Sequence, residues 1–177
     1  MRLKFLAVLF SALLLPGQDK GMAKRWQFEP DGFKGVKFLS SEQKAKKALP
    51  DLTCIDSAPA ISQEPERHCL LQIDANGWFI LASFQFTDDK LRAVYGEFDT
   101  KQFDAALKLF LKKYGRPTSA SPAAENLTLF WTGKRINLVL ERQYSEAKSS
   151  FLFALREDLD AEIRKGEEAK KDISPKK

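Results

Sequence analysis

The chain has 177 residues, of which 44% are apolar, with 29 Lys and Arg against 24 Asp and Glu. This balance is that of an ordinary globular protein and argues against a disordered chain, a collagen or a coiled-coil array. A formal net charge of +5, without a strong basic stripe or a recognisable motif, also argues against a nucleic-acid partner.

The N-terminus has the layout of a signal peptide. Two basic residues precede an apolar run, Phe5 to Leu15, which a Pro-Gly pair ends. The run is shorter than the roughly 20 apolar residues of a membrane-spanning helix. We expect cleavage after Ala23, with cleavage after Gly17 as the second choice and a buried N-terminal helix as the alternative. Residues 1–23 hold two more basic side chains than acidic ones, so their removal leaves a net charge of +3. We expect no transmembrane segment to remain after this removal.

The only cysteines are Cys54 and Cys69. An exported chain meets an oxidising compartment in which an even pair usually closes, so we predict a disulfide, whose loop of about 15 residues is worth roughly 3 kcal/mol. A reactive thiol pair or a metal site would need a closer cysteine spacing or more ligands, and His68 is the only histidine. Neighbours in a strand point to opposite faces, so His68 is expected to be exposed if the cystine is buried.

Residues 24–39 mix aromatic residues with turn formers and predict an irregular or edge-strand entry segment. We expect its four aromatic residues to pack under the domain. Ser40 stands three residues before Gln43, which is the spacing of a capping box. The sequence therefore predicts a short helix from about Ser41 to Leu49, which Pro50 ends. The four aromatic residues are Trp26, Phe28, Phe33 and Phe38.

An antiparallel meander is predicted next. After Leu52 to Ile55 and a proline-containing loop, His68 to Ile73 is rich in branched and aliphatic residues, and an Asn-Gly pair follows with turn chemistry. Trp78 to Phe86 predicts a central strand, with Trp78, Ile80, Ala82, Phe84 and Phe86 on one face and Phe79, Leu81, Ser83 and Gln85 on the other. A polar turn then leads into Leu91 to Phe98.

The clearest helix follows Asp99 or Thr100. Its apolar residues recur at helical spacing from Phe103 to Tyr114, and Gly115 is placed for a left-handed cap. Thr118 to Ala124 is expected to be a small-residue loop. A hairpin is predicted across the turn Thr132-Gly133-Lys134-Arg135, with a last strand at Phe151 to Leu155. The apolar helix positions are Phe103, Ala106, Leu107, Phe110, Leu111 and Tyr114.

The predicted fold is α+β: an antiparallel sheet covered by a short and a long helix. The predicted organisation is a signal peptide at 1–23, a single domain at 24–156, and a charged C-terminal helix and tail at 157–177. Phe38 and Phe98 lie 60 residues apart, and each precedes a capping signal, a helix, a proline and a set of strands. This order suggests a diverged tandem repeat, although the two helices differ in length and few residues match.

The segment GVKFLSSEQKAKKALP, Gly35 to Pro50, with a meander behind it, resembles small bacterial envelope proteins that fold a short helix over an antiparallel sheet. The small outer-membrane-assembly lipoproteins and the tandem beta-lactamase-inhibitor-like proteins are examples. FDAALKLFLKKYGRPT, Phe103 to Thr118, is similar to a recurring segment of uncharacterised periplasmic proteins. The chain lacks the lipid-bearing cysteine and the Gly-Met start of the assembly lipoproteins. The resemblance implies a binding or scaffolding role in an envelope and assigns no functional residue.

Catalytic chemistry has little support in the sequence. A serine hydrolase would need a G-x-S-x-G motif, and the glycines lack the spacing and ending of a phosphate-binding loop, so we expect no cofactor. The adjacent carboxylates Asp88-Asp89 and Glu157-Asp158 are the pairs available to a hydrolase, but catalysis needs carboxylates opposed across a cleft. We assign no catalytic, cofactor-binding or metal-binding residue.

The two helices are rich in lysine. If both cover one sheet face, their outer sides form a basic surface that suits anionic lipid headgroups, cell-wall polymer or an acidic protein, or that simply aids solubility. The sequence thus predicts an exported periplasmic or secreted protein that binds a protein or an anionic envelope component. An inhibitor of a secreted enzyme, using the loop Asp56 to Arg67, and a small carboxylate-dependent hydrolase are the alternatives. The expected interaction residues are Lys44, Lys46, Lys47, Lys101, Lys108 and Lys112.

Overall fold

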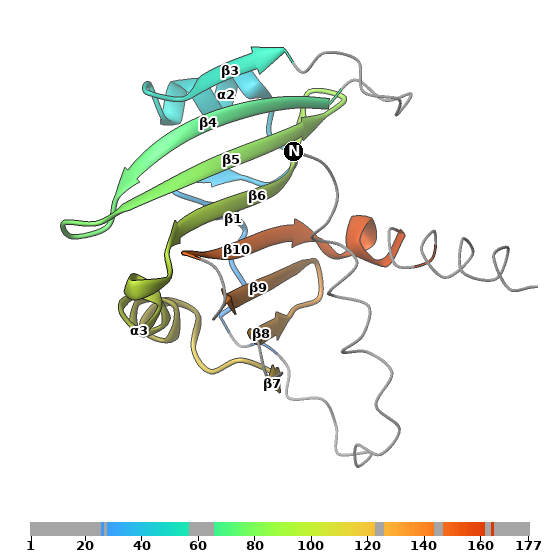
Figure 1. The fold of residues 1–177 in the computed structure, drawn as a ribbon. Coiled ribbons are helices and arrows are strands. Elements are labelled where there is room, and N and C mark those ends of the chain that lie inside the picture. Colours follow the sequence, from blue (N-terminus) through green and yellow to red (C-terminus); the bar gives the residue numbers. More distant parts are fainter. Residues whose placement is uncertain are drawn as a thin grey trace, which may run out of the picture.

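The computed structural model describes residues 26, 28–56, 66–122, 126–143, 147–161 and 164. The predicted signal peptide with both cleavage sites, most of the predicted inhibitory loop, and the tail from 165 onward lie outside the described residues. The described residues form an antiparallel sheet of eight strands with a short and a long helix packed against it, which confirms the predicted fold class (Figure 1).

The entry segment contains a small hairpin of β1 (Gly32–Phe33) and β2 (Val36–Lys37). Trp26, Phe33 and Phe38 are buried, as predicted. Phe28 is the exception, because its side chain is 60% exposed and lies over Gly115 at the end of the long helix.

Helix α2 spans Glu42–Ala48, close to the predicted bounds. Its N-cap is Ser41 and not Ser40, since the Ser41 side chain accepts a hydrogen bond from the Lys44 N–H. Ser40 is engaged elsewhere: its hydroxyl donates to the Lys37 carbonyl, and its own carbonyl accepts from the Leu91 N–H. The capping-box prediction was therefore one residue early.

Four strands follow α2: β3 (Thr53–Asp56), β4 (Glu66–Asp74), β5 (Phe79–Thr87) and β6 (Lys90–Asp99). Neighbouring strands pair antiparallel, which confirms the predicted meander. Asn76 and Gly77 both have positive φ at the β4–β5 turn, as does the Asp88-Asp89 pair at the β5–β6 turn. Positive φ at both central residues is the geometry that joins two strands of a hairpin tightly.

A short 3-10 turn, η2 (Thr100–Gln102), leads into helix α3 (Phe103–Tyr114). Helix α3 begins at Phe103, later than the predicted start after Asp99 or Thr100, because the first turn is a 3-10 turn. Its end is as predicted, since Gly115 follows with φ of 77°. Its buried residues are Phe103, Ala106, Phe110 and Tyr114. Leu111 was expected to join them, but it is 38% exposed because it lies at the flank of the buried stripe.

The second half of the sheet contains β7 (Ser119–Pro122), β8 (Asn126–Thr132), β9 (Ile136–Gln143) and β10 (Lys148–Leu155). The β8–β9 hairpin and the last strand agree with the sequence analysis. β7 corrects the predicted small-residue loop, since its backbone pairs with β8 from Ser119 to Pro122. An edge strand needs only backbone partners, so small residues without apolar alternation can form it. A helical segment begins at Arg156 after β10.

The strand order is β3-β4-β5-β6-β10-β9-β8-β7. A helix followed by four strands thus occurs twice, as α2 with β3–β6 (the first unit) and as α3 with β7–β10 (the second unit). The two units meet where their last strands pair antiparallel. At this junction Gly96 lies opposite Phe151, and a Cβ atom at position 96 would stand 2.3 Å from the Phe151 ring. The close approach explains why the junction has a glycine.

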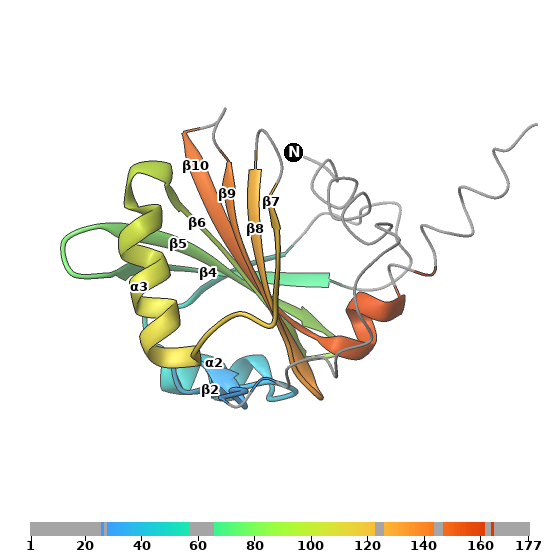
Figure 2. The ribbon, with the colours of Figure 1, turned by 90° about the horizontal axis from the view of Figure 1, so that it is seen from below.

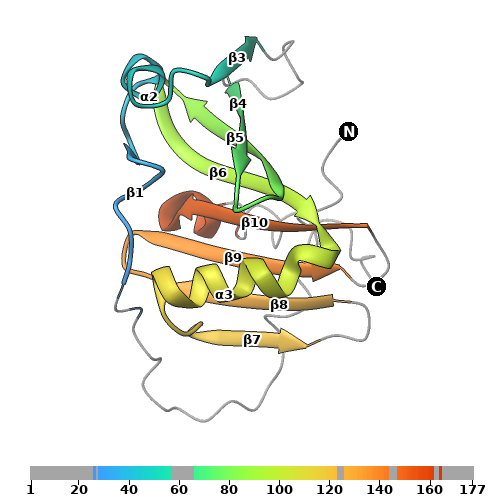
Figure 3. The same ribbon diagram turned by 90° about the vertical axis from the view of Figure 1, so that its left-hand side faces the viewer.

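Both helices and the β1–β2 hairpin lie on the same side of the sheet, with the hairpin between α2 and α3 (Figures 2 and 3). We call this side the helix face and the opposite side the outer face. The aromatic core lies on the helix face, where Phe110 of α3 contacts Tyr114, Trp131, Phe151 and Phe153. Phe33 of the hairpin extends this core to Phe84 of the first unit.

The entry segment is attached to the second unit. The Glu29 carboxylate accepts hydrogen bonds from the N–H groups of three consecutive residues of the β8–β9 turn, Lys134, Arg135 and Ile136, at 2.8, 2.6 and 2.8 Å. The Trp26 indole donates to the Tyr114 carbonyl at 2.8 Å. Partial burial acts to raise the pKa of Glu29, but the three backbone donors outweigh it and lower this pKa below its usual value.

Candidate functional site

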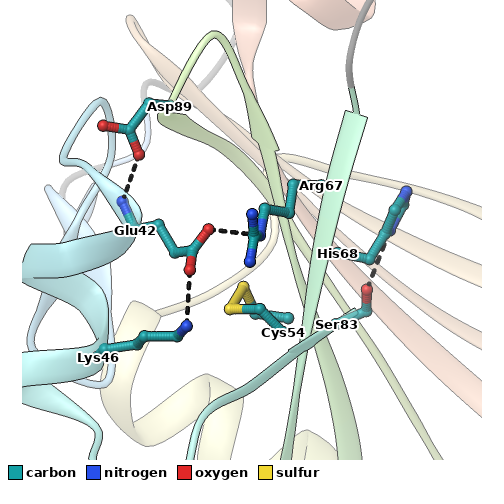
Figure 4. The surroundings of a disulfide bond; sticks show 8 residues. Glu42, Lys46, Cys54, Arg67, His68, Ser83 and Asp89 are labelled. Carbon is teal, nitrogen blue, oxygen red and sulfur yellow. Dashed lines mark hydrogen bonds and ion pairs between the residues drawn. A yellow bond between two sulfur atoms is a disulfide. The ribbon is translucent and has the colours of Figure 1, made fainter. Parts of the chain in front are cut away.

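The predicted disulfide is present. Cys54 and Cys69 are directly opposite on β3 and β4, and their sulfur atoms are bonded (Figure 4). Cys69 is fully buried on the helix face, whereas Cys54 is partly exposed. The bond ties the edge strand of the first unit to its neighbour and closes the loop that contains residues 57–65.

An ionic network surrounds the disulfide (Figure 4). The Glu42 carboxylate of α2 binds Arg67 Nε of β4 at 2.6 Å and Lys46 Nζ at 2.7 Å. The Glu42 backbone N–H donates to Asp89 at 2.9 Å, so a carboxylate from the β5–β6 turn occupies the positive end of α2. The network fastens α2 to β4 and to the β5–β6 turn of its own unit.

A metal ion is not favoured in this cluster. One carboxylate oxygen of Glu42 and the two cysteine sulfurs lie within 4.8 Å of one another, and they form the one group of three potential ligands found among the described residues. The two sulfurs are bonded to each other, and the carboxylate already pairs with two cations. Thiolate ligation needs free deprotonated sulfur, so the oxidised cluster is a structural tie.

His68 lies on the outer face, opposite to Cys69, as strand alternation predicts. Its ring is half-buried rather than exposed, and its Nδ1 lies 3.5 Å from the Ser83 hydroxyl of β5. The strand β5 beside it explains the lower exposure. The contact joins side chains of two paired strands on one face, which is the arrangement of an ordinary cross-strand pair.

Three of the four carboxylates considered for a hydrolase have structural partners. Asp89 caps α2, and Asp88 lies beside it in the turn. Glu157 and Asp158 both bind the Arg92 guanidinium and hold the segment after β10 against β6. These hydrogen bonds raise the pKa of Arg92, with the Asp158 hydrogen bond as the largest cause. The roles shown for these carboxylates are a helix cap and ion pairs, which are structural.

All six lysines of the predicted interaction surface are exposed on the helix-face side. They do not form one compact patch, because the β1–β2 hairpin separates α2 from α3 (Figure 3). Lys46 is paired with Glu42, so its charge is partly neutralised. The other five have no ion-pair partner among the described residues: Lys44, Lys47, Lys101, Lys108 and Lys112.

Sequence reasoning missed an apolar patch on the outer face of the first unit. Phe79 and Leu81 of β5 are 60% and 50% exposed, and Ile55 of β3 is 52% exposed. The strand register places half-buried Leu70 of β4 on the diagonal between Ile55 and Leu81. We call these four residues the apolar diagonal. The signal in the sequence was a strand that is apolar on both faces, which was interpreted only as evidence for a central strand.

Polar groups border the apolar diagonal on the side of the second unit. Glu97 of β6 lies directly opposite Leu81, accepts a hydrogen bond from the Tyr95 hydroxyl at 2.9 Å and pairs with Lys148 at 3.2 Å. Burial and the adjacent Glu97 both raise the pKa of Tyr95, so its hydroxyl stays protonated and donates. Glu141 lies in the same row of the sheet beyond Ser150. This border thus has two carboxylates and one lysine, whereas α2 and α3 carry an excess of lysine.

A family model, that of the TP0088 domain, matches residues 31–160, about three quarters of the chain. The matched region begins just before β1 and ends in the helical segment after β10, so it contains both helix-and-four-strand units. No curated protein and no solved structure matches the chain. No helix among the described residues has the length and apolar character needed to cross a membrane.

Proposed function

We propose that this chain, which belongs to the TP0088 domain family, is an exported envelope protein that works by non-covalent binding, and that the apolar diagonal is where it contacts a protein partner. The main support for this proposal is that Phe79, Leu81 and Ile55 are all exposed on one face of the sheet. Scattered exposed apolar residues are normal, but large ones gathered on one face mark an interaction site.

Several features support export. The basic and apolar N-terminal layout is that of a signal peptide, and a disulfide is stable in an oxidising compartment. The family match begins at Asp31, and buried Trp26 stands just after the expected cleavage at Ala23. Mass spectrometry of the protein recovered from cell fractions should find Lys24 as the first residue in the envelope or secreted fraction. An intact Met1 in the cytoplasmic fraction would refute export.

The border of the diagonal indicates the chemistry of the partner. Glu97 and Glu141 lie on the outer face, as the apolar diagonal does. Lys148 pairs with Glu97 there. A protein surface with aliphatic or aromatic residues beside Lys or Arg side chains complements this arrangement. The cationic side chains would steer the encounter, and burial of the apolar residues would hold the complex.

Site-specific photo-crosslinking in the producing cell tests the proposal. A photoreactive amino acid at position Leu81 should give one discrete adduct, whereas the same group at exposed Lys134, on the β8–β9 turn, should give none. The double variant Phe79→Ser with Leu81→Ser, crosslinked from position Gln72, should lose the adduct that the otherwise unchanged chain gives there. Equal adducts at Leu81 and Lys134, or none at Leu81, would contradict the proposal.

A stability measurement separates binding from folding. Because Phe79 and Leu81 are at least half exposed, the double serine variant should lose no more than about 1 kcal/mol in free energy of unfolding. Gln72→Ser, on the same face opposite Leu81, is the matched control. A loss above about 3 kcal/mol in the double variant would mean that these side chains serve the fold.

A further inference from the structure

A straight line of lysines runs along α3. Lys101 precedes the helix in η2, and Lys108 and Lys112 follow at steps of seven and four residues, which correspond to two turns and one turn. These three residues, which we call the lysine line, lie on the side of the helix opposite to buried Phe103 and Phe110. All three are exposed, and α3 lies lengthwise on the sheet with this side outward (Figure 3).

The lysine line is not neutralised within the described residues. Asp104, the acidic residue within α3, binds Arg142 of β9 at 3.4 Å. The Asp99 carboxylate caps the backbone N–H of Lys101 rather than a lysine side chain. Like charges one turn apart, as at Lys108 and Lys112, weaken a helix slightly. Lys112 lies in the last turn, where a cation interacts favourably with the helix dipole, so both effects on the stability of the fold are small.

Apolar side chains flank the lysine line on both sides. Leu109 and Leu111 are 39% and 38% exposed and project to either side of it. Lys113 and Lys34 extend the positive charge at the C-terminal end of α3. These two cations lie close enough for Lys34 to help lower the pKa of Lys113, after the larger effect of desolvation.

We propose that the outward side of α3 docks on an anionic lipid surface. Lysines attract anionic headgroups, and flanking leucines gain by entering the boundary of the acyl chains. A polysaccharide or a nucleic acid would use the lysines but would leave Leu109 and Leu111 in water. This surface is distinct from the apolar diagonal on the outer face, so the inference does not depend on the proposed protein partner.

Vesicle flotation tests the proposal on the full exported protein with its disulfide intact. Vesicles of phosphatidylcholine alone are compared with vesicles containing about one third phosphatidylglycerol, in low salt of about 0.05 M and high salt of about 0.5 M. We expect at least tenfold stronger partitioning onto the anionic vesicles in low salt, and most of the difference should vanish in high salt. All variants share the same N-terminus, and binding to phosphatidylcholine alone reports any contribution from it.

Matched double variants locate the surface. Lys108→Gln with Lys112→Gln should weaken binding to the anionic vesicles about 25-fold, since each lysine near an anionic leaflet contributes roughly fivefold. Lys44→Gln with Lys47→Gln removes the same charge from α2 and should change binding less than twofold. If both double variants lost vesicle binding equally, binding would depend only on the net charge of the protein, and the proposal would be overturned.

A leucine variant distinguishes a lipid from another polyanion. Leu109→Ser with Leu111→Ser keeps every charge and should weaken vesicle binding at least fivefold, while binding to the soluble polyanion heparin stays unchanged. Unchanged vesicle binding in this variant, or equal binding of the parent protein to neutral and anionic vesicles, would overturn the proposal. Circular dichroism of each variant confirms that α3 is still folded.

Discussion

The two helix-and-four-strand units share one layout but are held together differently. In the first unit α2 has seven residues and buries only Ala45, whereas α3 of the second unit has twelve and buries four residues. The cystine and the Glu42 network lie in the first unit, and the aromatic cluster around Phe110 lies mainly in the second. The difference indicates that covalent and ionic ties take the place of apolar burial where the helix is too short to supply it.

The largest expected effect comes from a change in the aromatic core of the second unit. Phe110 contacts four other aromatic rings, so Phe110→Ala should lower the free energy of unfolding by about 3–5 kcal/mol. Ala45→Gly, at the single buried position of α2, should cost only about 1 kcal/mol. Urea denaturation measures both. Similar losses at the two positions would show that the helices contribute equally.

Removal of the disulfide tests the covalent tie of the first unit. Cys54→Ala with Cys69→Ala opens a loop of 15 residues and should cost about 3 kcal/mol. Hydrogen exchange should speed up in β3 and β4 before it does in β8 and β9, because the tie belongs to the first unit. A thiol count on the denatured, unreduced parent protein should find no free thiol, and two free thiols would disprove the bond.

The junction between the units is tested by Gly96→Ala. The added methyl group meets the Phe151 ring, which belongs to the aromatic core and has little room to move. We expect a loss of about 2 kcal/mol in the free energy of unfolding. Gly77→Ala is a control for a change with no steric contact, since no atom lies within 4 Å of a Cβ at that position, although its positive φ adds some strain. An unchanged stability for Gly96→Ala would mean that the units join more loosely than described.

The hydrogen bonds of the Glu29 carboxylate link the entry segment to the second unit, and their strength depends on pH. Glu29→Gln should cost about 1–2 kcal/mol at pH 7, since the amide has one acceptor oxygen for three N–H donors. The pKa of Glu29 is lower in the folded state than in the unfolded state, so its contribution is present above about pH 4.5 and is lost as the pH falls through the folded-state pKa. The stability difference between parent and variant should therefore shrink from pH 7 to pH 3. A constant difference would contradict the role of the charge.

The smallest effect concerns the ionic tie. Glu42→Gln removes the ion pairs with Arg67 and Lys46, both of which are partly exposed, so we expect a loss below about 1 kcal/mol that shrinks further in high salt. A larger loss in the disulfide-free background than in the parent would show that the two ties of the first unit support each other. Strict additivity would show that they act separately.

Local patterns in the sequence predicted much of the fold. The apolar spacing from Phe103 to Tyr114 with Gly115 defined α3, and alternation in Phe79 to Phe86 assigned the buried face of β5. The two cysteines alone predicted the disulfide. Each of these signals is carried by neighbours along the chain, which is why it can be recognised without knowledge of the tertiary structure.

The missed features depend on distant residues. Ser40 and Ser41 are equally good caps, and the choice between them follows from the pairing of Ser40 with Leu91. The hydrogen-bond donors to Glu29 lie 105 to 107 residues further along the chain, and no local sequence pattern predicts this contact. The apolar diagonal was missed for the same reason, because a strand that is apolar on both faces does not reveal which face the helices cover.

The position of Trp26 and Glu29 sets an order of events during synthesis. A chain that emerges N-terminus first exposes these residues early, yet their partners extend from Tyr114 to Ile136. The central pairing of β6 likewise waits for β10, which ends at Leu155. The native structure therefore cannot close until nearly the whole domain has been made, and an emerging chain stays open for most of its synthesis.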